Sequence, residues 1–277
     1  MMQQEKINFV FFGTPDVASK TLEILKSNGY LPSLIVTSPD KPQGRKMIIT
    51  PPPAKVWAMD NNIPYLQPDK ISSELTNQVY SHKDLDLFIV VAYGIILPDD
   101  FIKIPKFGTI NIHYSLLPKY RGASPVEACL LNGDTVTGVS IQQMEFKLDS
   151  GPILVEEKVE IDINDTKDLL REKLIKIGAD LICKILPNII NNNIEGKIQN
   201  ENDATFCKKI KKEHGEIDPN GNAKDNWNKY RAYFGWPGVF FFKDNKRIKI
   251  TKAKYENDEF IIQRIIKEGG KETDYTI

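Results

Sequence analysis

The feature that most constrains the fold is the regular alternation of short apolar runs with amphipathic helical segments through the first part of the chain. This alternation indicates βαβ units and a mainly parallel sheet. The expected strands are 7–12, 31–37, 87–91, 109–113, 137–144 and 153–161, and the expected helices are 17–28, 53–61, 73–82, 125–132 and 166–191. The predicted fold class is therefore α/β, with a Rossmann-like, mainly parallel sheet and helices on both faces.

The periodicity changes after residue 204. Residues 238–242, 247–253 and 259–266 are separated by Asp- and Asn-rich turns, a pattern typical of short antiparallel strands. We therefore predict an α/β domain at 1–204 and a small domain of short antiparallel strands at 205–277. The second part carries 16 Lys and Arg against 11 Asp and Glu, although the whole chain has 37 of each. Such a basic excess suits contact with RNA phosphates.

Several classes of protein are disfavoured by the composition. No run approaches the roughly 18 apolar residues of a membrane span, and Met1–Lys6 does not resemble a signal peptide, so we expect a cytoplasmic protein without a membrane partner. The three cysteines are widely spaced, which supports neither a disulfide framework nor a zinc site. Gly13-Thr14-Pro15 does not match the dinucleotide-binding fingerprint, and we expect no metal.

Three residues suggest catalysis. Asn111 and His113 are two positions apart at the end of a predicted strand, so their side chains project to the same face at the edge where α/β proteins bind ligands. An imidazole can exchange a proton near neutral pH, and a carboxamide can donate hydrogen bonds to a developing oxyanion. Asp149, in a Gly-Pro loop, could orient the imidazole or accept a proton.

Each of these residues also has an ordinary structural explanation. His113 could be a hydrogen-bonded residue at the end of a sheet, Asn111 an edge residue and Asp149 a turn former. The combination favours a site, because the other two histidines, His82 and His214, lie in charged surroundings typical of solvated surface.

The segments around these residues resemble the formyltransferase family that uses 10-formyltetrahydrofolate. The resemblance covers roughly the first two hundred residues, and the short strands after residue 204 are similar to the family's small C-terminal β-barrel, which is OB-like and shortened here. It is carried by Asn111-x-His113 with Ser115–Pro118 following it, Arg121–Pro125, Asp149–Gly151, Phe12–Asp16 and Val90–Pro98. It implies formyl transfer to an amine, with Asn111 and protonated His113 stabilising the oxyanion and Asp149 holding the imidazole. It also implies folate contacts from Ser115, Leu116, Leu117, Pro118, Val91, Tyr93, Gly94 and Ile96.

The loop Ser38–Lys46, closing with Pro51–Lys55, resembles the basic loop with which the tRNA-modifying members of this family enter an acceptor stem. Its prolines and glycine exclude a helix or a central strand and leave an exposed arm. Its basic residues could contact phosphates, or they could simply be solvated. The resemblance implies that Lys41, Arg45, Lys46 and Lys55 bind methionyl-initiator tRNA. We also expect the protein to be a monomer.

Two other functions stay open. A sugar-nucleotide N-formyltransferase would share the catalytic residues but would have little use for the basic loop. Tyr114, where some sugar formyltransferases carry an aromatic residue, and the short C-terminal part keep this alternative in view. A folate- or RNA-binding module without catalysis is the second alternative, which the intact Asn111, His113 and Asp149 disfavour.

Overall fold

A computed structural model describes residues 7–44, 46–82 and 84–276. Within these residues the larger sheet has the order β10-β9-β7-β6-β1-β2-β5. Its strands are β1 (Phe9–Gly13), β2 (Leu34–Val36), β5 (Tyr65–Leu66), β6 (Leu87–Val91), β7 (Thr109–His113), β9 (Val136–Gln143) and β10 (Ile153–Glu160). The strands from β7 to β5 are parallel, whereas β9 and β10 are antiparallel to their neighbours. The predicted mainly parallel sheet is confirmed.

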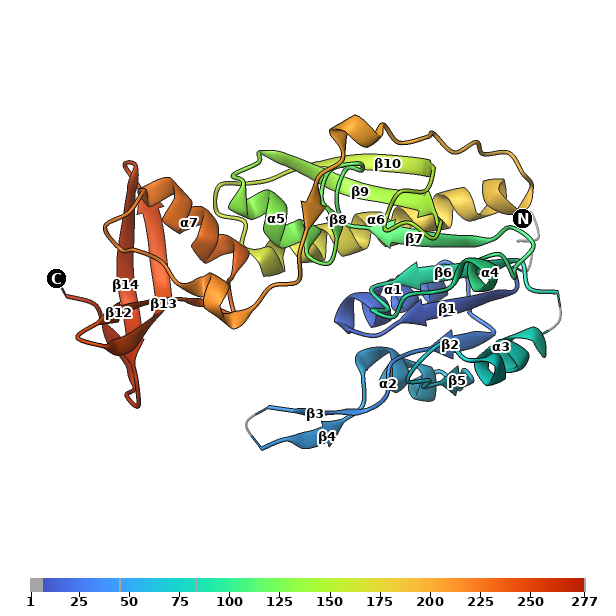
Figure 1. Cartoon of the computed structure of the whole chain (residues 1–277), viewed down its shortest axis with the longest axis horizontal. Helices are drawn as coiled ribbons and strands as arrows, with labels where there is room; N and C mark the ends of the chain where they lie inside the picture. Colours follow the sequence, from blue (N-terminus) through green and yellow to red (C-terminus); the bar gives the residue numbers. More distant parts are fainter. Residues whose placement is uncertain (1–6, 45, 83, 277) are drawn as a thin grey trace.

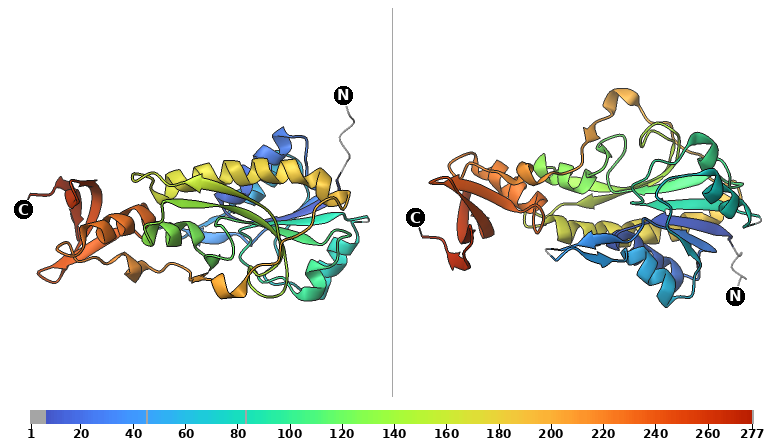
Figure 2. Two further views of the ribbon diagram at one scale, coloured as in Figure 1. Left: turned by 90° about the horizontal axis from the view of Figure 1, so that it is seen from above. Right: turned by 60° about the horizontal axis from the view of Figure 1, so that its bottom comes forward.

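Helices cover both faces of this sheet (Figures 1 and 2). The helices α1 (Asp16–Ser27), α2 (Pro53–Asp60), α5 (Pro125–Leu131) and α6 (Lys167–Ile190) share one apolar core, and α3 (Ser73–Tyr80) and α4 (Asp99–Ile102) share the other. Strand β1 shows the reason: Phe9 and Phe11 pack into the first core, and Val10 and Phe12 into the second. Because side chains alternate along a strand, a continuous apolar run fits a sheet that is covered on both sides.

Gly13, which ends β1, is required by close packing. A Cβ at this position would lie 2.6 Å from Cβ of Ala18 and 2.9 Å from the carbonyl oxygen of Val91. The glycine therefore lets the start of α1 approach the sheet.

The basic loop forms a hairpin that projects from the body of the protein (Figure 1). Strands β3 (Lys41–Gln43) and β4 (Ile48–Thr50) pair antiparallel in a separate two-stranded sheet, and nearly all of their residues are exposed. The predicted exposed arm is confirmed, and it contains two short strands that were not expected. Pro42 has no backbone N–H to donate. It is tolerated here because the hairpin is separate from the main sheet and has no central strand.

The C-terminal part is an antiparallel sheet with the order β12-β13-β14-β15, made of β12 (Val239–Lys243), β13 (Lys246–Glu256), β14 (Glu259–Lys267) and β15 (Glu272–Asp274). In the described residues β12 and β15 do not pair with each other, so the shortened barrel-like unit is an open sheet. Even the five-stranded OB-fold is only partly closed, and four strands supply still less curvature.

The helix α7 (Ala223–Ala232) was not predicted, because its sequence AKDNWNKYRA is mostly polar. Asn222 caps it by accepting a hydrogen bond from the backbone N–H of Asp225. Trp227 and Tyr230 are buried, and the helix packs between α5 and the C-terminal sheet. Tertiary packing therefore overrides a weak local signal.

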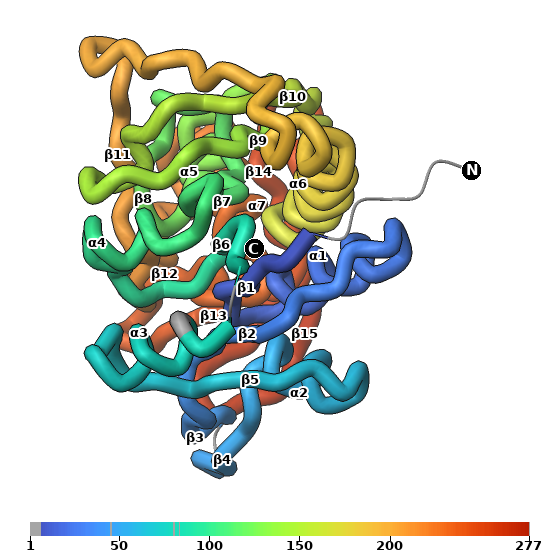
Figure 3. Tube along the Cα trace, turned by 90° about the vertical axis from the view of Figure 1, so that its right-hand side faces the viewer, coloured from blue at the N-terminus to red at the C-terminus, as the bar shows by residue number. Residues whose placement is uncertain are grey.

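The chain returns to the larger sheet after α6 (Figure 3). Residues 197–208, called the strap below, begin with a bridge between Lys197 and Ile153 and contain the 3-10 turn Glu201–Asp203. They end in β11 (Phe206–Cys207), which pairs parallel with β8 (Arg121–Gly122). Residue 205, where we predicted the second domain to start, lies inside the strap, and this boundary stays a prediction. In the described part of the chain, no helix combines the length and apolarity needed to cross a bilayer.

The buried face of α6 should contribute strongly to stability. Leu174 is fully buried in the first core, whereas Leu169, on the same helix, is 55% exposed. We expect Leu174→Ala to lower the free energy of unfolding by about 2–5 kcal/mol, through lost burial and a residual cavity. Leu169→Ala is the matched control and should cost less than about 1 kcal/mol. Urea unfolding measures both variants, and equal losses would contradict this packing.

Candidate functional site

Asn111 and His113 lie on one face of β7, as predicted. In the sheet Asn111 is paired with Val90 on one side and Gln142 on the other, and His113 is paired with Ser140. The intervening Ile112 faces α6, where a Cβ on Gly178 would lie 3.0 Å from its Cγ2. The sheet therefore presents an amide and an imidazole on the face opposite α6.

Asp149 completes this group from a distant loop. Its carboxylate accepts hydrogen bonds from the backbone N–H of Gly122 (2.8 Å), from Nε2 of Gln142 (2.9 Å) and, weakly, from Nδ2 of Asn111 (3.4 Å). The side chain is only 12% exposed. A carboxylate with so little solvent needs such donors, and β7, β8 and β9 each supply one.

His113 lies between two hydrogen-bond acceptors. Its Nε2 is 2.9 Å from the carbonyl oxygen of Tyr120, which can only accept, so Nε2 carries a proton. Its Nδ1 is 3.7 Å from Oδ2 of Asp149. Because the Tyr120 carbonyl occupies Nε2 and 3.7 Å exceeds a hydrogen-bond distance, Nδ1 is the ring nitrogen left to face a ligand. In an imidazolium, Nδ1–H can donate to a substrate oxygen that carries negative charge.

The segment Ser115–Pro118, predicted to bind folate, forms a rigid turn beside His113. Oγ of Ser115 donates to the carbonyl oxygen of Lys119 (2.6 Å), and the N–H of Leu117 donates to Oγ of Ser140 (3.0 Å). Ser115 and Leu117 are buried, and Leu116 and Pro118 are partly exposed. The carbonyl oxygens of Ser115, Leu116 and Pro118 also accept hydrogen bonds within the protein. The turn is therefore held in place, and the partly exposed Leu116 and Pro118 are left for a ligand.

The second predicted folate segment divides into buried and exposed residues. Val91 is fully buried in the core on the α6 side, and Tyr93 packs its ring against Phe12 in the other core. The hydroxyl of Tyr93 is buried, and burial raises the pKa of Tyr93 to about 12. Gly94 and Ile96 are exposed, the latter to 81%. Any ligand contact from Val91 or Tyr93 would therefore involve the backbone, whereas Ile96 can offer its side chain.

The four residues predicted to bind tRNA occupy different environments. Lys41 and Lys46 are exposed on the hairpin, and Arg45 lies outside the described residues. Lys55, in α2, forms an ion pair with Asp40 at 2.8 Å and keeps only 16% of its side chain exposed. Hydrogen bonds from Gln67 and then Lys55 hold the pKa of Asp40 below its usual range. Lys55 thus holds the base of the hairpin through Asp40, and it does not add to the exposed positive charge that Lys41 and Lys46 provide.

Tyr114 does not face the site. Its ring lies near Gly178 on the α6 side of the sheet, and its hydroxyl is buried there. Tyr114, the aromatic residue that favoured a sugar-nucleotide formyltransferase, therefore packs in the core. The sheet separates it from the side chains of Asn111 and His113.

Sequence reasoning missed the residues that surround Asp149. Gln142 was assigned only to a strand, and Gln199 lies 50 positions from Asp149, to whose carbonyl oxygen it donates. Strand alternation in β9 places the polar side chain of Gln142 on a covered face of the sheet, and this unusual position could have identified it. No local signal could have identified Gln199.

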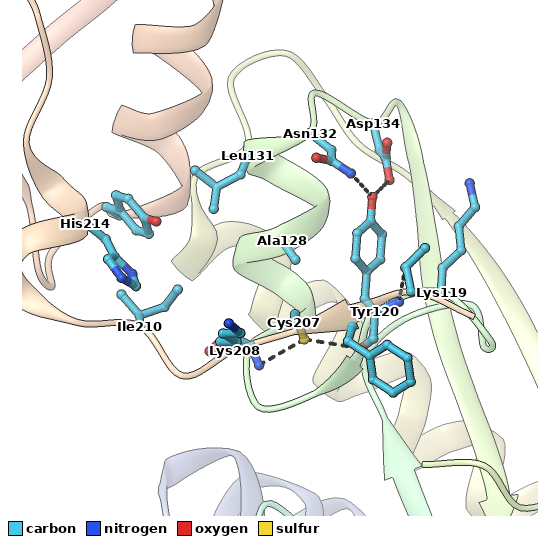
Figure 4. Close-up of a pocket in the computed structure, with 14 residues that line it drawn as sticks. Lys119, Tyr120, Ala128, Leu131, Asn132, Asp134, Cys207, Lys208, Ile210 and His214 are labelled. Atoms are coloured by element: carbon cyan, nitrogen blue, oxygen red, sulfur yellow. Dashed lines mark hydrogen bonds between the residues drawn. The ribbon is translucent and has the colours of Figure 1, made fainter. Parts of the chain in front are cut away.

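A pocket of about 460 Å³ adjoins the site between α5 and the strap (Figure 4). The side chain of Tyr120 lines it, donating to Asp134 (2.6 Å) and accepting from Asn132 (2.7 Å), while the Tyr120 carbonyl faces His113. Burial raises the pKa of Tyr120. The other lining residues are Lys119, Ser124, Ala128, Leu131, Thr205, Phe206, Cys207, Lys208, Ile210, His214 and Tyr233.

In the residues that the structure describes, no group of three or more His, Cys, Asp or Glu is arranged to hold a metal ion. An amide donor, an imidazole and a buried carboxylate converge on one face of an α/β sheet. This group of side chains suits an enzyme whose reaction places negative charge on a substrate oxygen.

Comparison with known proteins identifies the class more closely. The formyl transferase model matches residues 5–186, and the model of the formyl transferase C-terminal domain matches residues 209–271. The chain belongs to the formyl transferase family. It is 40% identical, over 258 residues, to a methionyl-tRNA formyltransferase of Caldicellulosiruptor saccharolyticus, covering 91% of this chain and 82% of that protein.

Two solved structures share the fold. An N-formyltransferase from Helicobacter canadensis, in complex with folinic acid and dTDP-3-aminofucose, matches with a TM-score of 0.68 and 22% identity over 90% of this chain and 89% of that chain. A methionyl-tRNA formyltransferase from Clostridium thermocellum matches with a TM-score of 0.63 and 15% identity, over 97% and 100% of the two chains. At these identities the structures support the fold alone.

Proposed function

We propose that this enzyme transfers the formyl group of 10-formyltetrahydrofolate to the free amine of methionyl-initiator tRNA. The observation that carries the proposal is the convergence of Asn111, His113 and Asp149 in a chain that also presents an exposed basic hairpin. The relative named for methionyl-tRNA, which is similar over nine-tenths of this chain, supports the same acceptor.

In the proposed reaction the amine nitrogen attacks the formyl carbon, and the new C–N bond forms as negative charge moves to the formyl oxygen. Nδ2 of Asn111 and the imidazolium of His113 stabilise that oxygen. The bond to N10 of the folate then breaks, and N10 takes up a proton. The proton lost by the amine passes toward Asp149 or a bound water, so one proton leaves the acceptor and one reaches the donor.

The donor site in this proposal lies beside β7. The exposed Ile96 and the open backbone at Gly94 follow β6, which is hydrogen-bonded to β7 next to Asn111. An apolar side chain next to an exposed glycine suits a flat heterocycle, which needs apolar contact on its faces and hydrogen bonds along its edge. The rigid turn Ser115–Pro118 would bound the same site.

The acceptor side of the proposal uses two regions. The hairpin presents Lys41 and Lys46 to solvent, where they can contact the phosphates of an acceptor stem. The pocket beside Tyr120 has the exposed ring of Phe206 together with Lys119 and Lys208. An aromatic ring with nearby cations suits a single-stranded nucleotide, which stacks its base and pairs its phosphate.

The acceptor is tested directly by formyl transfer from 10-formyltetrahydrofolate to three substrates. We expect transfer to methionyl-initiator tRNA and at least tenfold lower kcat/KM with methionyl-elongator tRNA and with an amino-sugar nucleotide. Transfer to the sugar alone would retain the catalytic residues and refute the tRNA assignment. Absence of transfer to all three would favour a binding module.

Removal of the Asn111 amide should impair catalysis but leave the fold intact. We expect Asn111→Ala to lower kcat by about a hundredfold to a thousandfold, the usual cost of losing one oxyanion donor. Asn188→Ala, at an exposed position of α6, is the control and should retain full turnover. Steady-state kinetics and thermal melting distinguish lost chemistry from unfolding, and a folded Asn111→Ala enzyme with normal kcat would refute the role of Asn111.

The hairpin lysines should act on tRNA binding alone. The double variant Lys41→Ala/Lys46→Ala should raise KM for methionyl-tRNA and flatten its dependence on salt, since each lost phosphate contact reduces the logarithmic slope by about 0.7–0.9. The KM for the folate donor should not change. The paired control is Lys184→Ala, on α6 away from the hairpin. An unchanged salt slope would show that the hairpin does not contact phosphates.

A further inference from the structure

Residues of the strap form a polar cluster with Arg121 of β8 behind the Asp149 turn. Arg121 is fully buried and Gln199 is 6% exposed. The guanidinium of Arg121 donates to Oε1 of Gln199 from Nη2 (2.7 Å) and Nε (3.1 Å), and Nη2 also donates to Glu201 (2.7 Å). The bond from Arg121 and a second one from Lys147 lower the pKa of Glu201 to about 2. The cluster thus joins the strap to Arg121, which directly precedes Gly122, and the N–H of Gly122 donates to the carboxylate of Asp149.

The amide nitrogen of Gln199 holds the turn that carries Asp149. Its Nε2 donates to the carbonyl oxygen of Asp149 at 2.9 Å and to that of Gly151 at 2.7 Å. The amide has two hydrogens, which these two short bonds use, and a longer contact of Nε2 reaches Oε1 of Gln142 at 3.4 Å. Its oxygen is meanwhile occupied by Arg121, so the orientation of the amide is determined from both sides.

This turn has little freedom to adjust by itself. Asp149 has φ of 47°, in the left-handed region that residues other than glycine adopt only when their surroundings hold them there. A Cβ on Gly151 would lie 1.8 Å from the carbonyl oxygen of Gln143, so the turn presses directly on β9. The carboxylate of Asp149 is thereby held near His113, with Oδ2 3.7 Å from Nδ1 of the imidazole.

We infer that Gln199 is a positioning residue, which places the carboxylate of Asp149 for catalysis by clamping the two carbonyl groups of its turn. This inference rests on the proposed catalytic role of Asp149. It assigns to the strap, outside the matched N-terminal family region 5–186, a part in the chemistry of the site.

Docking of the strap does not depend on this clamp. The strap pairs with β8 through backbone bonds from Arg121 N–H to the Thr205 carbonyl (2.9 Å) and from Ala123 N–H to the Cys207 carbonyl (3.2 Å). The N–H of Tyr120 donates to Oγ1 of Thr205 at 2.8 Å. The bonds from Gln199 to the Asp149 turn are additional to these backbone and side-chain bonds.

Gln199→Glu separates positioning from docking. Glutamate has the same length and can still accept from Arg121, but an ionised carboxylate has no hydrogen to donate to the two carbonyl groups. We expect kcat for formyl transfer to methionyl-tRNA to fall about 10- to 100-fold, the usual scale for a misplaced catalytic group, with both KM values within about twofold of wild type. The matched control is Ile198→Ala, since Ile198 is 83% exposed on the same strap.

A second measurement keeps the inference testable if Gln199→Glu is unstable. Gln199→Ala is combined with Asp149→Ala, and single-turnover rates are compared for the four enzymes of the cycle. If Gln199 acts through Asp149, the Gln199→Ala change costs tenfold or more in wild type and less than about twofold in Asp149→Ala. Equal costs in both backgrounds, or a folded Gln199→Glu enzyme with wild-type kcat, would overturn the inference. Absence of transfer by the wild-type enzyme would instead overturn the proposed function.

Discussion

The structure of the site depends on one constraint, the hydrogen bonding of a nearly buried carboxylate. An ionised side chain with as little exposure as Asp149 is costly unless donors replace its water. Those donors come from Asn111 on β7, Gly122 on β8 and Gln142 on β9, so three elements must meet at one point. The imidazole of His113 lies beside this carboxylate, with Nε2 bonded to the Tyr120 carbonyl and Nδ1 3.7 Å from Oδ2 of Asp149.

The C-terminal half of the chain therefore takes part in building the site. The strap adds a strand beside β8 and presents Gln199 to the carbonyl groups of the Asp149 turn. The helix α7 then packs on α5, which links the C-terminal sheet to the same part of the catalytic domain. A buried Arg121 that bonds both Gln199 and Glu201 makes this connection specific, because an unpaired buried guanidinium would be strongly destabilising.

Chemistry and recognition are separated in space. The proposed catalytic side chains lie on β7 and on the loop after β9, held by hydrogen bonds to neighbouring strands and turns. The proposed tRNA contacts lie on the projecting hairpin and at the pocket beside Tyr120. Rigid strands suit a reaction that needs exact placement, and exposed basic residues suit contact with a large, highly charged partner. Different acceptors could therefore be served by changes in the outer regions without altering Asn111, His113 or Asp149.

The sequence by itself determined the longer strands and helices of the α/β part and the common face of Asn111 and His113, because periodicity and strand alternation are local properties. Tertiary structure decided the rest. It placed Val91 and Tyr93 in the cores, paired Lys55 with Asp40, formed α7 from a mostly polar segment and left the C-terminal sheet open. It also brought Gln199 to a turn 50 residues away. Which buried donor meets which acceptor depends on contacts between distant segments, and these exist only once the whole chain has folded.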